Sequence, residues 1–368
     1  MTQATKRDIL LTRFSALGDV AMTVGPIYDA CRANPDRRFI LLTRSHPATL
    51  FINRPENLTV HPVDTADYPG PRGLMRLRRE LDALYDIGTV ADLHDVLRTR
   101  LLRSLFRLTG RPTYHIDKRR AERRRLTRPR HKHLVQLTPM RDRYAETLAR
   151  ATGKRAPGRF TSIFPEPPDP ALFAGATGPK QPGQRWIAIA PFAAHAGKVY
   201  PEDLMGETVR LLAQLPDTRI FIFGFGDKES ETIETWRKAN PGADIVNMAA
   251  RKIGLPAELA LLAHCDTMLS MDSANMHLAG LAGLRTVSIW GATHPFCGFR
   301  GACQKDSDIL QLEMTCRPCS VFGNKPCLRK DLHCLRGISP ARVAAAVAAA
   351  SSSPTPGAGR ADGTDRKS

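Results

Sequence analysis

The stretch from Met268 to Gly291 (MLSMDSANMHLAGLAGLRTVSIWG) constrains the fold most, because it reads as a complete strand–loop–helix–strand unit. A short apolar run ends at Asp272 and Ser273, two residue types that often cap the start of a helix. Apolar and small residues then recur at helical spacing up to Gly283, and Thr286 to Trp290 predicts the next buried strand. The free N–H groups at such a helix start suit a phosphate or diphosphate.

Short apolar runs alternate with helical patterns through both halves of the chain, which is typical of α/β folds with parallel, doubly wound sheets. A chain of 368 residues fits two such domains better than one. Strands are predicted at 9–12, 39–42 and 86–90, and then at 186–190, 219–223, near 245, at 268–271 and at 286–290.

Prolines and glycines crowd together between the two halves, as expected of an interdomain connection. We therefore predict a Rossmann-like domain over 1–165, a linker over 166–185 and a second Rossmann-like domain over 186–350. A low-complexity tail, 351–368, is predicted to be disordered.

The chain carries 54 basic and 36 acidic residues, a net charge of +18, so we expect an anionic partner: nucleic acid, an anionic membrane surface or a phosphorylated substrate. The densest basic run is Lys118–His133. Such a run is usually a solvated loop, and its functional alternative is an electrostatic guide for an anionic acceptor or membrane. It has no interleaved aromatic residues, which weakens the nucleic-acid interpretation. The helix predicted over 97–108 adds four arginines.

The sequence favours a cytoplasmic protein that touches a membrane only peripherally. No apolar run reaches the roughly 18 residues that cross a bilayer. The amino terminus passes directly into a strand pattern, without the apolar core of a signal peptide.

Four of the eight cysteines are scattered singly, so no general disulfide framework is expected. The other four, Cys316, Cys319, Cys327 and Cys334, fall in one segment with the spacing C-x2-C-x7-C-x6-C. One CxxC pair and two more thiols could surround a structural zinc, but a second CxxC is missing. Free or redox-active thiols stay open as the alternative, and an iron–sulfur site is less favoured.

Several further motifs follow predicted strands. In Ile9–Val20 (ILLTRFSALGDV), Gly18 lets the backbone approach a ligand closely, and Asp19 lies where a helix start favours negative charge. The strand at 186–190 runs into Pro191–Lys198 (PFAAHAGK). Gly224-Phe225-Gly226 follows the strand at 219–223, but it lacks the third glycine of a dinucleotide fingerprint.

These motifs, in this order, resemble glycosyltransferase family 9, the lipopolysaccharide heptosyltransferases. Ile9–Val20 is similar to the amino-terminal signature of the family, and Asp92-Leu93-His94 with Arg98 to its second block. Pro191–Lys198 with Pro201 resembles the phosphate loop. Asp272–Ala279 resembles the donor-site block, and Gly291–Pro295 the turn after it.

The resemblance implies a GT-B architecture, with an acceptor-binding first domain and a nucleotide-sugar-binding second domain that face each other across a cleft. It also implies inverting transfer of a heptose from ADP-heptose to a lipopolysaccharide core or lipid A type acceptor, without a catalytic metal, at the inner membrane. The implied partners are therefore the nucleotide sugar, an anionic glycolipid and the membrane surface, with no nucleic acid.

The same resemblance assigns roles to residues. Asp19 would be the general base that glycosyl transfer needs, and Ser15, Gly18, Asp92, His94 and Arg98 would bind the acceptor. The donor would be bound by Lys198, Asp272, Ser273, Ala274, Asn275 and His277. Glu229, outside the matched motifs, could accept a hydrogen bond from a ribose hydroxyl of the donor. The bland alternatives are a helix cap for Asp19, a solvated loop lysine for Lys198, a packing histidine for His277 and a surface role for Glu229.

Two positions depart from the family pattern, because Ala274 stands where glycine is usual and Tyr200 where tryptophan often precedes the proline. These departures leave the identity of the donor open, and two rival functions remain. One is a GT-B enzyme that uses another nucleotide sugar, such as a hexosyltransferase or an epimerase. The other is a basic nucleic-acid-binding protein.

Overall fold

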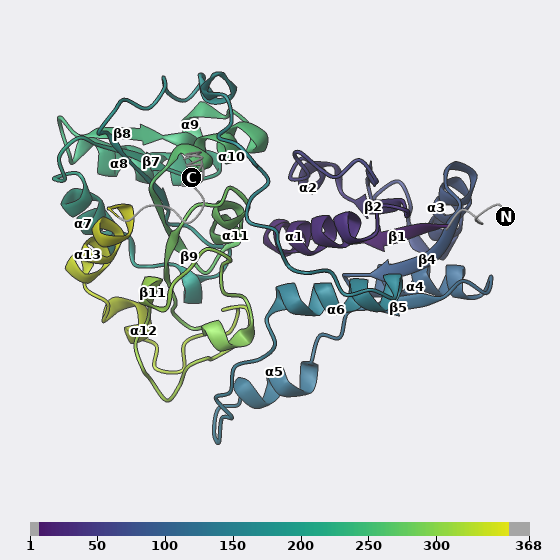
Figure 1. The fold of residues 1–368 in the computed structure, drawn as a ribbon. Coiled ribbons are helices and arrows are strands. Elements are labelled where there is room, and N and C mark those ends of the chain that lie inside the picture. Colours follow the sequence, from purple (N-terminus) through teal and green to yellow (C-terminus); the bar gives the residue numbers. More distant parts are fainter. Residues whose placement is uncertain (1–6, 353–368) are drawn as a thin grey trace, which may run out of the picture. The chain divides into compact units, whose positions relative to one another are not determined.

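The computed structural model describes residues 7–352, which form two compact α/β units (Figure 1). The first unit comprises the chain up to Glu122 together with Leu137–Ile163. The second comprises Arg123–Gln136 and the chain from Phe164 onward. Each unit has its own parallel sheet, so the predicted α/β class with two doubly wound sheets is confirmed.

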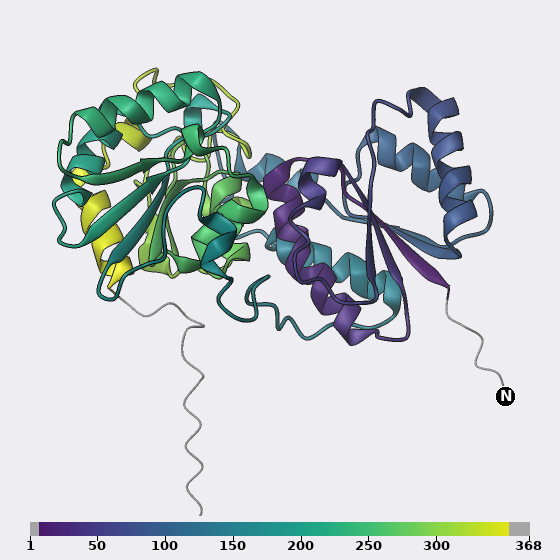
Figure 2. The same cartoon turned by 90° about the horizontal axis from the view of Figure 1, so that it is seen from above.

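The first unit is built on a five-stranded parallel sheet in the order β3-β2-β1-β4-β5. Its strands are β1 (Asp8–Thr12), β2 (Phe39–Thr43), β3 (Leu58–Pro62), β4 (Ile87–Asp92) and β5 (Thr113–His115). Its helices are α1 (Leu17–Ala33), α2 (Ser45–Ala48), α3 (Gly70–Leu84), α4 (Leu97–Arg107) and α6 (Met140–Thr152), while α5 (Arg120–Leu126) spans the boundary. Helices α1 and α6 pack together on one face of the sheet, and α3 and α4 pack together on the other (Figures 1 and 2).

The second unit has a six-stranded parallel sheet in the order β11-β10-β9-β6-β7-β8. Its strands are β6 (Arg185–Ala190), β7 (Thr218–Ile222), β8 (Asp244–Asn247), β9 (Thr267–Met271), β10 (Thr286–Ile289) and β11 (Ile309–Leu310). Its α-helices are α7 (Glu202–Leu212), α8 (Gly226–Lys238), α9 (Met248–Arg251), α10 (Leu255–His264), α11 (Ala274–Leu281), α12 (His333–Arg336) and α13 (Pro340–Ser351). Four 3-10 turns complete it: η1 (Pro170–Phe173), η2 (Ala196–Lys198), η3 (Pro295–Cys297) and η4 (Asp306–Asp308).

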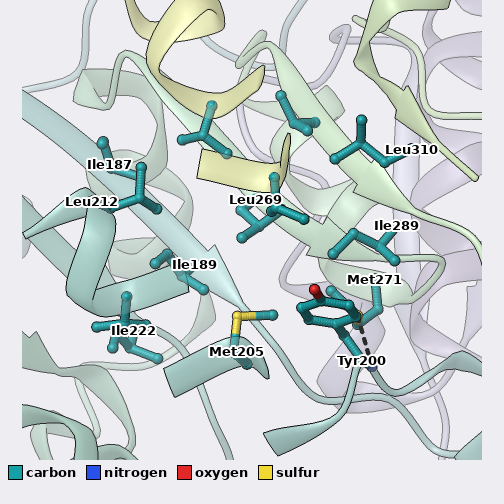
Figure 3. Close-up of a cluster of buried hydrophobic side chains, with 14 of the residues drawn as sticks. Ile187, Ile189, Tyr200, Met205, Leu212, Ile222, Leu269, Met271, Ile289 and Leu310 are labelled. Carbon is teal, nitrogen blue, oxygen red and sulfur yellow. Dashed lines mark hydrogen bonds between the residues drawn. The ribbon is translucent and has the colours of Figure 1, made fainter. Parts of the chain in front are cut away.

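A core of fully buried aliphatic side chains joins one face of this sheet to α7, α8 and α13 (Figure 3). Every other residue of β6 faces this core, as Ile187 and Ile189 show, and α7 contributes Met205 and Leu212. Tyr200 is fully buried among them, and its hydroxyl donates a hydrogen bond to the Ile338 carbonyl. Tyrosine at this position is therefore a core residue whose polar end is satisfied.

Most predicted strands lie within one or two residues of the observed ones, whereas several elements had no clear signal. The sequence interpretation missed β3, α3, β5 and α13. The polar and apolar pattern over 134–151 predicts a helix there, but the observed α6 begins only at Met140. Pro139 at the N-cap explains the later start, because proline fixes an extended backbone before the first turn.

The segment expected to link two domains is packed into the second unit. It contains η1, whose Phe173 is fully buried and lies edge-on against the rings of Trp186 and His264. Residues 351 and 352 end α13, and the remainder of the predicted disordered tail lies outside the described residues.

The basic run Lys118–His133 is not a solvated loop throughout. Part of it is α5, where the buried Arg123 guanidinium lies 5.3 Å from the ring centre of Phe299. Lys132 is half-buried and donates to the carbonyls of Cys316 and Pro318. Five arginines of the run are exposed and can act as an electrostatic guide: Arg120, Arg124, Arg125, Arg128 and Arg130. Within residues 7–352, no helix is both long enough and apolar enough to span a membrane.

Candidate active site

Asp19 lies in the first turn of α1, directly after β1, as the sequence predicts. Its carboxylate is held 2.7 Å from the Arg13 guanidinium, and 30% of the Asp19 side chain is exposed. Arg13 is itself buried, donates to the Leu93 carbonyl at 2.9 Å and lies over the Tyr144 ring. Asp19 is therefore a fixed, partly open carboxylate rather than a capping residue, since the N-cap of α1 is Ala16. Ser15 and Gly18 form the turn beside it.

Asp92 ends β4 next to β1, and its side chain is completely buried. Its Oδ1 accepts from the backbone N–H groups of His94 and Asp95, at 2.9 and 2.8 Å, and Oδ2 is 3.0 Å from Arg103. These contacts shape the β4–α4 turn. Asp92 has no exposed surface for an acceptor, so we correct its predicted role from acceptor binding to positioning.

His94 is brought to the same edge as Asp19, where its Nδ1 faces the Phe14 N–H at 3.5 Å. Burial, assisted by the positive charges of Arg13 and Lys118, lowers the pKa of His94 to about 3, so the imidazole stays neutral. Arg98 turns away, because its guanidinium donates to the Tyr68 carbonyl at 2.8 Å. His94 therefore accompanies Asp19 at this edge, whereas Arg98 braces a neighbouring loop.

Lys198 and Asp272 meet in the second unit, on the loops that follow the neighbouring strands β6 and β9. The Lys198 Nζ lies 2.9 Å from Asp272 Oδ2, with 16% and 4% of the two side chains exposed. The sequence analysis assigns each residue a donor-binding role but does not predict that the two form an ion pair. A phosphate that approaches Lys198 must share its charge with Asp272.

The helix start at α11 adds backbone donors beside this pair. Ser273 occupies the N-cap position, yet its hydroxyl makes no capping bond and instead lies 3.4 Å from the Ser270 hydroxyl. Asp272 precedes the cap and is engaged by Lys198, so the prediction that it caps the helix is wrong. Ala274 and Asn275 are half-buried in the first turn, where N–H groups lack helical partners. His277 is half-buried one turn further on.

Glu229 lies on a separate loop, in the first turn of α8 after β7. Its Oε2 accepts from the Phe225 N–H at 2.7 Å, so the carboxylate caps the start of its own helix. This hydrogen bond favours a structural surface role for Glu229 over donor binding. It leaves the other carboxylate oxygen for a ligand.

The loop that carries Lys198 is braced by the cysteine-containing segment. Gly197 accepts from the Ala292 N–H at 2.8 Å, and Ala292 accepts from the Cys319 N–H at 2.7 Å. A Cβ on Gly197 would lie 2.8 Å from both the Ala292 Cβ and the Gly323 carbonyl oxygen. Glycine is therefore required there, because three segments meet without room for a side chain.

Arg317 locks these segments together. Its guanidinium is fully buried and donates to the carbonyls of Gly291, Leu312, Trp290 and Thr293 and to the Gln311 side chain. A buried charge is tolerated when its hydrogen-bonding capacity is satisfied in this way. Arg317 thus joins the turn after β10 to the segment that carries the cysteines.

All four clustered cysteines line one pocket of about 550 Å³, together with Ala194–Gly197 of the phosphate loop. None of the eight cysteines, all of which lie within residues 7–352, forms a disulfide. Burial raises the pKa of Cys319 and raises the pKa of Cys334 to about 11, and the neighbouring thiols of the cluster add to both increases. Over residues 7–352, however, no group of three or more His, Cys, Asp or Glu side chains is placed to hold a metal ion. The thiols are gathered but do not form a ligand set.

A family model described as glycosyltransferase family 9 (heptosyltransferase) matches residues 74–327. The chain belongs to glycosyltransferase family 9. Family membership places it among enzymes, as the sequence motifs predicted. Among curated proteins, lipooligosaccharide heptosyltransferase 2 of Campylobacter jejuni is 27% identical over 125 residues, which is 34% of this chain. The match spans only 38% of that relative's length.

Solved structures share the fold of this family-9 chain. A family 9 glycosyltransferase from Veillonella parvula superposes with a TM-score of 0.72, at 17% identity, over 95% of this chain and 98% of that one. E. coli ADP-heptose LPS heptosyltransferase II gives 0.64, at 17% identity, over 94% and 98%. E. coli heptosyltransferase WaaC with ADP-2-deoxy-2-fluoro heptose gives 0.60, at 17% identity, over 83% and 93%.

Sequence reasoning missed the partners that hold the candidate residues. Arg13 belongs to the Ile9–Val20 motif, but its ion pair with Asp19 depends on the geometry of a turn that residue spacing does not predict. Lys118 stood in the basic run, yet it lies near Arg13 and Asp19 and donates to the Asp95 carbonyl at 3.2 Å. Burial lowers the pKa of Lys118, and the nearby Arg13 lowers it further.

Lys198→Met is expected to weaken ADP binding by about 1.5–3 kcal/mol, the usual contribution of a charge-assisted contact. The single variant also leaves the buried Asp272 carboxylate unpaired, so Lys198→Met/Asp272→Asn should be measured beside it by calorimetry. Lys180→Met is the matched control, because Lys180 pairs with Asp266 elsewhere in the same unit. Parent-like ADP affinity in both Lys198 variants would remove Lys198 from the donor site.

His94 predicts a specific dependence of stability on pH. Its pKa is about 3 when folded and about 6.5 when unfolded, so below pH 6.5 only the unfolded state takes up the proton. As the pH falls below about 6.5, this proton uptake by the unfolded state should lower the free energy of unfolding by about 1.4 kcal/mol per pH unit. His94→Gln should flatten the slope between about pH 6 and pH 4 by that amount, as measured by chemical unfolding followed by circular dichroism. The exposed His46→Gln control should leave the slope unchanged.

Proposed function

We propose that this chain is an inverting, metal-independent glycosyltransferase that transfers a heptose from ADP-heptose to a lipopolysaccharide core or lipid A type acceptor. The observation that carries the proposal is the Lys198–Asp272 pair at the start of α11 in a family-9 chain. A solved neighbour contains ADP-2-deoxy-2-fluoro heptose, and another is an ADP-heptose transferase by name. These relatives support the choice of donor.

Donor binding would use charge and dipoles in place of a metal. A departing diphosphate needs positive charge, which Lys198 and the N–H groups of Ser273, Ala274 and Asn275 would provide. The chain has one Asp-x-Asp triplet, Asp306-Ser307-Asp308, of the kind that often binds a metal–diphosphate. Arginines already engage both acids: Asp308 pairs with the buried Arg285 and Asp306 with Arg300. This engagement supports the metal-independent route.

The acceptor hydroxyl would lose its proton to Asp19. The carboxylate is partly open and held in one orientation by Arg13, which pre-organises a general base. The neutral His94 and the cation of Lys118 lie near it, and they suit a hydroxylated, anionic sugar. The exposed arginines of α5 would attract such an acceptor from solution or from a membrane surface.

The localisation that fits this function is cytoplasmic and peripheral to the inner membrane, where a glycolipid acceptor is held. We also retain a structural zinc at Cys316, Cys319, Cys327 and Cys334 as a proposal, although the thiols are not arranged as a ligand set here. Metal analysis of the purified protein decides between zinc and free thiols, and no catalytic step depends on the outcome.

A calorimetric screen of ADP-, UDP- and GDP-sugars tests the donor. ADP-heptose should bind most tightly, and EDTA should leave both binding and transfer intact because cations of the chain hold the diphosphate. Preference for a UDP- or GDP-sugar would replace the heptosyltransferase proposal with another GT-B activity. Salt-dependent DNA binding without any donor binding would instead support the nucleic-acid alternative.

Asp19→Asn should lower turnover by about 10²–10⁴-fold, the usual contribution of general-base catalysis. The amide keeps the size of the side chain but cannot accept the proton. Heptose transfer is measured with ADP-heptose and a lipopolysaccharide-core acceptor, with donor affinity and melting temperature as controls for folding. Asp142→Asn is the matched variant, since Asp142 is an exposed acid in the first turn of α6. A loss of less than about tenfold would reduce Asp19 to a structural role.

A further inference from the structure

Helix α4 is apolar on two opposite faces, although only one of them is buried. Thr99, Leu102 and Phe106 are fully buried against the sheet of the first unit. On the other side, Leu97, Leu101 and Leu108 are 75%, 39% and 83% exposed. At 3.6 residues per turn these three leucines fall within about 40° of one another, nearly opposite the buried face. We call them the outer leucine stripe.

Leucines exposed in a row need an explanation, because a surface helix normally presents charged and polar residues to water. The stripe does not reflect a generally apolar helix. Between its leucines α4 carries Arg98, Arg100, Arg103 and Arg107 and not a single acidic residue. Arg100 and Arg107 are exposed and lie along one side of the stripe by the same helical spacing. The Arg100 guanidinium already pairs with Asp95, so Arg107 is the exposed arginine of this side that a lipid phosphate would reach.

The neighbouring helix extends this surface. Helix α3 packs beside α4 on the same face of the sheet (Figures 1 and 2). Leu74, Leu77 and Leu81 of α3 are buried, so its outer side carries the exposed Arg72, Met75, Arg76 and Arg79. The outer sides of α3 and α4 together present apolar side chains set among arginines.

We propose that the outer leucine stripe, with the arginines of α3 and α4, docks the first unit onto an anionic lipid surface. Leucines enter the boundary between headgroups and acyl chains, and arginines beside them bind lipid phosphates. A second copy of the chain is a poorer occupant. A twofold interface would bring the arginines of one stripe against those of the other, which is unfavourable. The inference deepens the proposed function, from which it takes the membrane-held acceptor.

The docking face belongs to the unit that carries Asp19, but the two occupy different parts of it. Asp19 follows β1 and α1 lies on the opposite face of the sheet from α3 and α4 (Figure 2). Residues of the stripe can therefore be changed without touching the candidate catalytic groups. This separation makes the surface testable apart from catalysis.

The test is co-sedimentation of the full chain with phosphatidylcholine vesicles, with and without phosphatidylglycerol, and without any glycolipid acceptor. The parent should bind only the anionic vesicles, and binding should weaken as salt rises from about 0.1 to about 1 M, where the Debye length falls from about 10 to about 3 Å. Leu97→Gln/Leu101→Gln/Leu108→Gln should reduce the vesicle partition coefficient by at least about tenfold. Arg72→Gln/Arg79→Gln/Arg107→Gln should reduce it on anionic vesicles alone.

The matched control is Leu172→Gln/Leu328→Gln, since these leucines are equally exposed but belong to the second unit. This variant should bind vesicles as the parent does, and unchanged melting temperatures exclude unfolding in every variant. No binding by the parent, or parent-like binding by the leucine variant, would overturn the docking surface. A dimer in gel filtration that the leucine variant abolishes would assign the stripe to a second copy. Because the vesicles contain no acceptor, the outcome does not depend on whether the chain transfers heptose.

Discussion

Both candidate sites depend on one constraint of parallel sheets: neighbouring strands release their carboxyl ends at the same edge. In the first unit the chain runs from β1 outward to β3 and returns to place β4 beside β1. In the second it runs from β6 to β8 and returns to place β9 beside β6. At such a reversal the two connections leave in opposite directions, which opens a crevice. Asp19 and His94 lie at the first reversal, and Lys198 and Asp272 lie at the second.

At each reversal the charged side chain of a candidate site residue is paired with a side chain of opposite charge. Arg13 fixes the Asp19 carboxylate, and Asp272 fixes the Lys198 ammonium. The Asp272 carboxylate is nearly inaccessible, so loss of Lys198 would leave a buried carboxylate without its ion-pair partner, which is unfavourable. A partner of this kind lowers the mobility of a long side chain before a ligand arrives, and less conformational entropy is then lost on binding. Under the proposed function the cost would be competition, because a diphosphate and Asp272 would share one cation.

The class of fold could be predicted from the periodicity of apolar residues. The loops that carry the candidate residues of each unit could be predicted from the order of the motifs. Apolar runs such as Ile9–Thr12 and Met268–Met271 are short, buried and bounded by turns, which makes their strands readable. Strand β3 (LTVHP) was missed because only its first residue is buried, so it lacks an apolar run. Ion pairs such as Arg13–Asp19 could not be predicted, because they depend on the direction of side chains in an irregular turn.

In the cysteine-containing segment, the sequence pattern correctly predicts that the thiols lie together. The interaction that holds the segment in place differs from the metal site that the pattern suggests. Its thiols do gather at one pocket beside the phosphate loop, as a metal-binding reading requires. The contacts that fasten the segment come instead from Arg317, whose guanidinium donates to four backbone carbonyls and to the Gln311 side chain. A guanidinium can replace a metal as a crosslink when backbone carbonyls converge on it. Gly197 then lies against this braced wall, so the position of Lys198 is set by a segment more than a hundred residues away in sequence.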